Sequence, residues 1–127
     1  MLLDNQPDKT ERYTFNGLLT NKDIEALLNN KRLKVVQVAG LMSPGAWQLL
    51  DQAILAKRPE IQFRLVSSHG GSCDLSCLQY MRNIRDFSVY SLGSAHSLET
   101  LSALSELESL SIGIRNLKDL SFLDSLP

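Results

Sequence analysis

The spacing of apolar residues near the C-terminus most restricts what this chain of 127 residues can fold into. Leucine or isoleucine recurs there in the frame LxxLxLxxxxLxxLxxLxxL. The frame is filled by Leu107, Leu110, Ile112, Leu117, Leu120, Leu123 and Leu126. A single strand would show alternation and a single helix a period near 3.6, so neither explains this spacing. The frame predicts a unit that repeats, made of a short strand and a return segment.

Two apolar residues separated by one position mark the strand of each predicted unit. The pairs are Tyr13 and Phe15, Val36 and Val38, Phe63 and Leu65, Phe87 and Val89, and Leu110 and Ile112. Their first members are 23, 27, 24 and 23 residues apart. We therefore expect one domain over residues 1–127, because neighbouring units must stack to bury their apolar faces. The expected units lie near residues 10–32, 33–59, 60–83, 84–106 and 107–127.

This repeat resembles the leucine-rich repeat family, most closely over residues 84–127. In the last unit Leu107, Leu110 and Ile112 match the family's strand. Its return segment is matched by Leu117, Leu120 and Leu123. The resemblance implies an α/β solenoid with a parallel strand ladder on one face and helices or extended returns on the other. It also implies a protein-binding scaffold with no catalysis of its own.

The return segments of the early units are predicted to be helices. Thr20 is a predicted N-cap, and apolar residues follow it at helical spacing. Ser43 and Pro44 predict a second N-cap and first helical position, and Pro59 is expected to end that helix. A shorter helix is expected from Cys73 to Met81. The helices therefore become shorter toward the C-terminus.

The residues that flank each apolar pair are predicted to point away from the core, since side chains alternate along a strand. The candidate partner-binding residues on this face are Arg12, Gln37, Gln62, Arg64, Asp86, Ser88 and Tyr90. Arg64 and Tyr90 are the expected anchors, because arginine and tyrosine are enriched among interface hot spots. The identity of the protein partner does not follow from these residues.

No polar capping unit follows the last repeat, although solenoids need caps to cover their apolar ends. Two interpretations remain open at this stage. Either the array continues in a longer protein, or the uncovered ends of two chains meet in a homodimer.

A second class of function would use the loop between Ser68 and Asp74. Its sequence, SHGGS, follows a predicted strand and precedes a predicted helix, which is the setting of an anion-binding loop. Candidate metal ligands are His69, Cys73, Cys77 and His96. The alternative to the scaffold is thus a small α/β ligand-binding domain with an anion or metal site at this loop. We favour ordinary packing, because buried cysteines commonly act as small apolar residues.

Charge and composition favour a soluble, non-catalytic, cytoplasmic protein. The net charge is −1, so nonspecific binding to nucleic acid is not expected. The apolar stretches are too short to cross a membrane, and residues 1–8 lack the basic start of a signal peptide. The two histidines give little basis for an enzyme, and we expect no cofactor.

Overall fold

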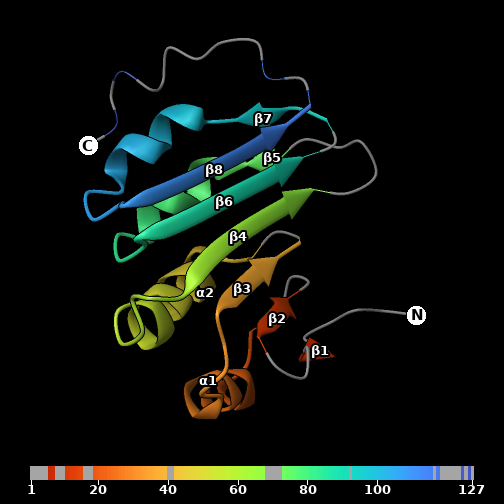
Figure 1. Cartoon of the computed structure of the whole chain (residues 1–127), viewed down its shortest axis with the longest axis vertical. Coiled ribbons are helices and arrows are strands. Elements are labelled where there is room, and N and C mark those ends of the chain that lie inside the picture. Colours follow the sequence, from red (N-terminus) through yellow and green to blue (C-terminus); the bar gives the residue numbers. More distant parts are fainter. Residues whose placement is uncertain are drawn as a thin grey trace.

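The computed structural model describes residues 6–7, 11–15, 19–39, 42–67, 73–91, 93–115, 117, 124 and 126. These residues form an α/β structure around a parallel sheet of five strands (Figure 1). The strands are β2 (Arg12–Phe15), β3 (Val35–Val38), β4 (Gln62–Ser67), β6 (Asp86–Ser91) and β8 (Ser109–Ile114). They are adjacent in the order in which they occur in the chain. A short strand, β1 (Gln6–Pro7), pairs antiparallel with β2 at one edge.

The register of the sheet aligns the apolar pairs that mark the predicted strands. Tyr13 lies beside Val36, then Phe63, Phe87 and Leu110 in successive strands. The second members of the pairs form the next row in the same way. The members in β2, β3, β4 and β6 are all buried, whereas those in β8 are only partly buried. The predicted parallel strands and their alignment are confirmed.

The first two helices begin where the sequence predicts. Helix α1 (Asn21–Asn29) has Thr20 as its N-cap, and the side chains of Thr20 and Asp23 form a capping box. Helix α2 (Pro44–Leu50) has Ser43 as its N-cap and continues directly into the π-helix η1 (Asp51–Leu55). The helical segment ends before Pro59, in agreement with the prediction.

The helix predicted from Cys73 to Met81 is present only over Leu75–Tyr80, as a 3₁₀-helix, and its predicted start was wrong. Cys73 and Asp74 form strand β5 (Cys73–Asp74), which pairs with β7 (Ala95–His96) in a separate sheet. The following 3₁₀-helix, η2 (Leu75–Tyr80), begins only after Asp74, whose carboxylate accepts a hydrogen bond from the Ser76 amide. Strand pairing keeps Cys73 extended, because its amide donates to the Ser94 carbonyl oxygen at 2.9 Å. A further 3₁₀-helix, η3 (Leu98–Ala103), packs beside η2.

The core lies between the sheet and the helices. Figure 1 shows α2 behind the strands, so that one face of the sheet is covered. On this face the rings of Phe63 and Phe87 stack with centroids 6.0 Å apart, and Trp47 of α2 meets Phe63 edge-on. Burial of these large side chains contributes strongly to stability. Within the described ranges, no helix has the length and apolar character needed to span a bilayer.

Candidate protein-binding face

The opposite face of the five-stranded sheet carries the side chains that alternate with the core. They form three rows: Arg12, Val35, Gln62, Asp86 and Ser109; Thr14, Gln37, Arg64, Ser88 and Ser111; and Ala39, Val66, Tyr90 and Gly113. Each of these residues is exposed or partly exposed. Asn16, which the pattern predicts in the third row, lies outside the described residues. The first two rows are mostly polar and the third is mostly apolar, and the side chains on β8 are small.

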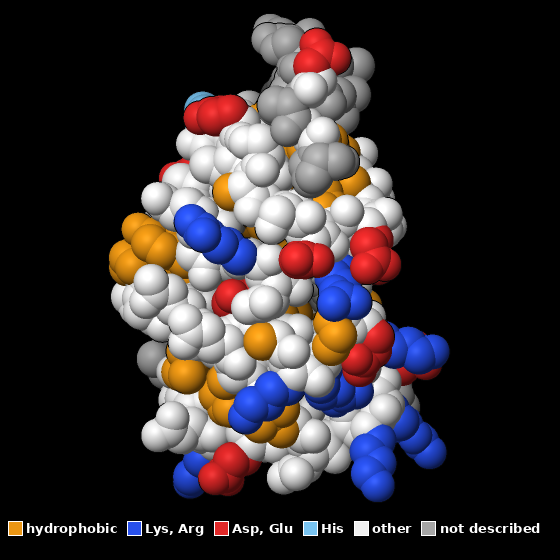
Figure 2. All heavy atoms as spheres, turned by 90° about the vertical axis from the view of Figure 1, so that its left-hand side faces the viewer, with side chains coloured by type: hydrophobic (Ala, Val, Ile, Leu, Met, Phe, Trp, Pro, Cys, Tyr) orange, Lys and Arg blue, Asp and Glu red, His pale blue; other side chains and the backbone are white. Residues whose placement is uncertain are grey.

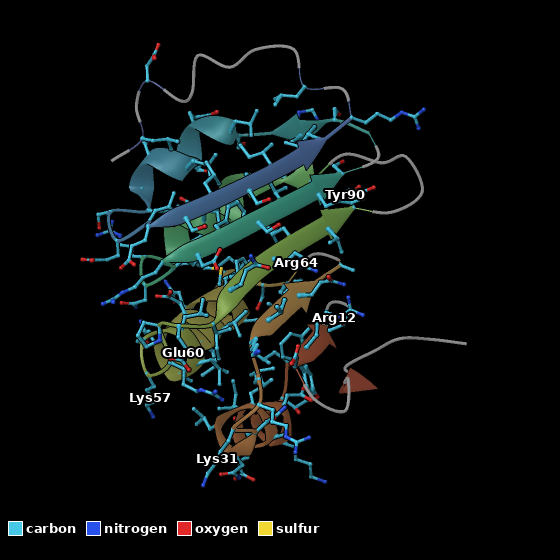
Figure 3. The ribbon with its side chains drawn as sticks, in the orientation of Figure 1. Arg12, Lys31, Lys57, Glu60, Arg64 and Tyr90 are labelled. Carbon is cyan, nitrogen blue, oxygen red and sulfur yellow. The ribbon has the colours of Figure 1, made fainter. Side chains whose placement is uncertain are left out.

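Arg64 lies at the centre of this face, on the middle strand of the five (Figure 3). Its Nη2 donates to the Gln62 side-chain oxygen at 2.9 Å, and its Nη1 approaches the Gln37 side-chain oxygen at 3.5 Å. Its Nε is buried and has no hydrogen-bond partner among the described residues. None of the ion pairs in the described part of the chain includes Arg64. The guanidinium is therefore held by neutral amides and its charge has no carboxylate partner there.

Asp86 extends the polar contacts around Arg64 to the next strand. The Gln62 side-chain amide donates to the Asp86 carboxylate at 3.1 Å while its oxygen accepts from Arg64. Side chains on β3, β4 and β6 are thus linked across the sheet. Because a linked side chain has less rotational freedom, less conformational entropy remains for a partner to remove.

Tyr90 is the large aromatic residue of this face, and 53% of its surface is exposed. It pairs in register with Gly113 of β8. A Cβ atom at position 113 would lie only 3.0 Å from Cδ2 of Tyr90, so the glycine allows the ring to rest on the backbone of β8. A shallow hollow beside the ring is lined by Tyr90, Ile112, Gly113, Ile114 and Arg115.

The predicted partner-binding residues therefore divide into groups. Gln37, Gln62, Arg64 and Asp86 are joined by hydrogen bonds. Ser88 pairs in register with Arg64, and Tyr90 lies two residues farther along the same strand. Arg12 lies on β2, with β3 between it and Arg64's strand, as Figure 3 shows.

The candidate metal and anion site is only partly described. His69 and the loop residues 68–72 lie outside the described residues. Cys73 and Cys77 are free and buried, and burial raises the pKa of Cys73 to about 11 and that of Cys77 to about 12. His96 is exposed in β7, where it pairs in register with Asp74. Among the residues that the structure describes, no three His, Cys, Asp or Glu side chains are grouped so as to hold a metal ion.

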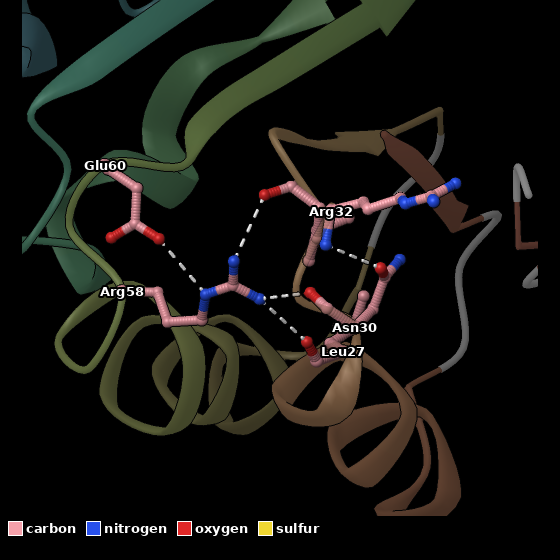
Figure 4. A network of polar contacts seen from close by, with 6 residues as sticks. Leu27, Asn30, Arg32, Arg58 and Glu60 are labelled. Carbon is pink, nitrogen blue, oxygen red and sulfur yellow. Dashed lines mark hydrogen bonds and ion pairs between the residues drawn. The ribbon is translucent and has the colours of Figure 1, made fainter. Parts of the chain in front are cut away.

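Sequence reasoning missed Arg58, which joins two successive predicted units. Its Nη1 donates to the carbonyl oxygens of Leu27 and Asn30, and its Nη2 donates to that of Leu33 (Figure 4). Its Nε lies 3.1 Å from the Glu60 carboxylate. The guanidinium thus satisfies carbonyl groups at the C-terminal end of α1 and in the turn before β3. These partners are backbone atoms distant in sequence, so no side-chain pattern could have revealed them.

Asp51 also joins two successive predicted units, by hydrogen bonds to Asn83. The sequence patterns did not predict this contact. Its carboxylate is buried and accepts hydrogen bonds from the Asn83 amide at 3.0 Å and from the Asn83 side chain at 2.8 Å. Burial raises the pKa of Asp51, while the hydrogen bonds from Asn83 oppose that shift. These hydrogen bonds connect η1 to the turn that leads into β6.

Ion pairs line the edge of the molecule at which the strands begin. Lys34 lies 3.5 Å from Glu11, and Arg85 lies 3.7 Å from Glu108. Figure 2 faces this edge and shows side chains of both charges interspersed along it. Such exposed pairs contribute little to stability.

Comparison of the chain with protein-family models, curated proteins and solved structures finds no match.

Proposed function

We propose that the chain is a leucine-rich-repeat-like solenoid that serves as a protein-binding scaffold, with its partner on the open face of the parallel sheet. The observation that carries the proposal is the environment of Arg64, a central cation held by Gln37 and Gln62 without a carboxylate partner in the described residues. Removing a charge from water is costly unless it is paired, so a carboxylate that reaches this position would be favoured. The scaffold performs no chemical step.

Tyr90 supports the same location. It offers a large, rigid ring beside a shallow hollow, and aromatic and arginine side chains often supply most of the binding energy of an interface. It lies on the strand next to that of Arg64 and on the same face. We therefore propose a partner that places an acidic side chain at Arg64 and an apolar group at Tyr90.

The proposed compartment is the cytoplasm. Cys73 and Cys77 are free thiols, and a reducing environment keeps them so.

A pull-down from a lysate tests the proposed face, with bound proteins compared by mass spectrometry. The test variant combines Arg64→Glu and Tyr90→Ala. The control combines Lys57→Glu and Leu49→Ala, which make a similar change of charge and apolar surface on exposed residues outside the face. Circular dichroism establishes that each variant is folded.

The proposal requires a protein that the wild type and the control capture and the test variant loses. Equal capture by all three chains would contradict binding through this face. Absence of any captured protein specific to the wild type would count against the scaffold function.

A further inference from the structure

Arg115 extends the open face of the sheet by one residue beyond β8. Its amide donates to the Ser91 carbonyl oxygen at 3.0 Å, so the pairing of β8 with β6 continues to this position. Because side chains alternate along a strand, the Arg115 side chain is directed to the same face as position 113. It is exposed, and no ion pair in the described part of the chain includes it.

The charges on this face are mostly positive. Three arginines and one carboxylate are directed to it from the described strands and from position 115. They are Arg12, Arg64, Arg115 and Asp86. Asp86 lies four residues before Tyr90 on β6, at the opposite end of the strands from Arg115. The described side chains around Tyr90 and Arg115 thus include cations and no acidic residue, although the whole chain has a net charge of −1.

Arg64, Tyr90 and Arg115 lie on one diagonal line across the sheet. Tyr90 is on the strand next to that of Arg64 and two residues farther toward the carboxyl end (Figure 3). Arg115 is displaced from Tyr90 in the same way, by one strand and two residues. Parallel strands about 4.8 Å apart, with about 3.3 Å per residue, make each diagonal step about 8 Å. The line therefore spans about 16 Å, with the tyrosine midway between the two cations.

The chemistry of this line favours an acidic partner. A carboxylate forms charge-assisted and often bidentate hydrogen bonds with a guanidinium group. The hollow beside Tyr90 and Arg115 is lined in part by Ile112 and Gly113, so an apolar side chain suits it. The complementary sequence is therefore an acidic residue, an apolar residue and a second acidic residue.

The length of the line favours an extended segment over a helix. Alternate residues of an extended chain face one side, so residues i, i+2 and i+4 cover about 13 Å. Residues i, i+4 and i+7 on one face of a helix cover only about 10 Å. The extended spacing is nearer to the span of about 16 Å, and the flexible arginine side chains can cover the difference.

We propose that the partner contributes an extended acidic segment in which alternate residues face the sheet. One carboxylate contacts Arg64, an apolar side chain contacts Tyr90, and a second carboxylate contacts Arg115. This inference rests on the proposed use of the open face for protein binding. It adds Arg115 as a residue that determines specificity, because a partner with a single acidic group would leave that cation unmatched.

NMR titration of the full chain with synthetic peptides tests this proposal. The test peptide contains Glu-Ser-Leu-Ser-Glu, and the control peptide contains Glu-Glu-Leu-Ser-Ser, which has the same composition and charge. We expect the test peptide to cause saturable shifts of the amides of Arg64, Tyr90, Gly113 and Arg115. The control should bind at least about tenfold more weakly, because one charged contact is lost. A peptide with Lys-Ser-Leu-Ser-Lys should not bind.

Variants of the chain separate a contact with Arg115 from the effect of net charge. Arg115→Glu should weaken binding of the test peptide at least about tenfold. Arg32→Glu changes the net charge equally at an exposed side chain in the turn before β3, so it is the matched control and should leave the affinity unchanged. Arg115→Lys should have an intermediate affinity, since it retains the charge but not the bidentate geometry.

Several results would overturn the proposal. One is the absence of saturable shifts at millimolar concentrations of the test peptide. Others are equal affinities for the two glutamate peptides, or equal affinities of the Arg115→Glu and Arg32→Glu variants for the test peptide. Tighter binding of a helical peptide with Glu, Leu and Glu at positions i, i+4 and i+7 would contradict the extended conformation.

The pull-down separates this inference from the proposed function. A protein captured by Arg115→Glu but lost by the variant that combines Arg64→Glu and Tyr90→Ala would contradict the second acidic contact. The same result would support binding through the open face. Equal capture by the wild type and both of these variants would contradict the proposed function as well.

Discussion

Arg58 donates a hydrogen bond from Nη1 to the carbonyl oxygen of Leu27, at 3.2 Å and across 31 residues of sequence. The same nitrogen donates to the Asn30 carbonyl oxygen at 2.6 Å. Arg58 follows the helical segment of the second predicted unit, whereas Leu27 belongs to the helix of the first. The side chain therefore holds neighbouring layers together through polar contacts, in addition to their shared apolar core.

Replacing Arg58 with alanine should lower the free energy of unfolding by about 2 to 4 kcal/mol, because three partly buried carbonyl groups lose a charged donor. Arg58→Lys should lose less, since an ammonium group can still reach some of these oxygens. Arg82→Ala, at an exposed side chain, is the control and should change stability by about 0.5 kcal/mol or less. Urea denaturation measures the free energy of unfolding of all three variants. Equal losses of stability for Arg58→Ala and Arg82→Ala would contradict a stabilising role for the hydrogen bonds of Arg58.

Asp51→Ala should also destabilise the fold, by about 2 to 3 kcal/mol, because both Asn83 donors lose their acceptor. Asp51→Asn should be milder, as it retains an oxygen acceptor and removes a buried charge. Thermal unfolding followed by circular dichroism gives the order of stability of the wild type and the two variants. An Asp51→Asn variant that is less stable than Asp51→Ala would contradict the role of Asp51 as a hydrogen-bond acceptor for Asn83.

Because its two cysteines are buried, we predict that the protein loses stability at high pH. Burial raises the pKa of Cys77 from its ordinary value of 9.0 to about 12, and that of Cys73 to about 11. The folded state therefore favours the protonated thiols. Their contribution is complete below about pH 9 and falls as the pH rises toward 11 and 12, because the unfolded thiols ionise first.

Urea titrations between pH 8 and about 11, under reducing conditions, measure this effect. The free energy of unfolding should fall more steeply for the wild type than for a Cys73→Ala, Cys77→Ala variant. Parallel pH profiles for the two proteins would show that the thiols do not contribute. Tyr13, whose pKa is also raised by burial, is present in both proteins and does not affect the comparison.

Gly113→Ala tests the position of the Tyr90 ring. The added methyl group would lie 3.0 Å from Cδ2 of Tyr90, a tight contact that the ring must relieve by shifting its position. We expect the variant to fold, because Gly113 is exposed and its neighbour is a side chain. Oxidative footprinting should report a changed reactivity of Tyr90, and an unchanged reactivity would contradict the close approach of the ring to Gly113.

The local patterns of the sequence account for the strands and the capped helices. Alternation around Phe63 and Phe87 identifies which side chains enter the core, and Thr20 and Ser43 satisfy amides within their own first turns. Such signals act over a few residues, so they can be recognised without a tertiary structure.

Other features depend on contacts that no local pattern contains. Cys73 is extended because it pairs with a segment more than twenty residues later, and Arg58 meets backbone oxygens of an earlier unit. The hydrogen bond from Arg64 to Gln37 likewise requires the register of adjacent strands. Sequence alternation predicts that these side chains share a face, but not how they contact one another.

The affinity of a captured partner for single-residue variants tests the proposed scaffold most directly. Isothermal titration calorimetry would compare the wild type with Arg64→Glu, Tyr90→Ala and the control Lys57→Glu. The account predicts binding weakened about tenfold or more by each of the first two changes, as for hot-spot residues, and little altered by the third. Equal affinities for all four proteins would contradict binding through the open face of the sheet.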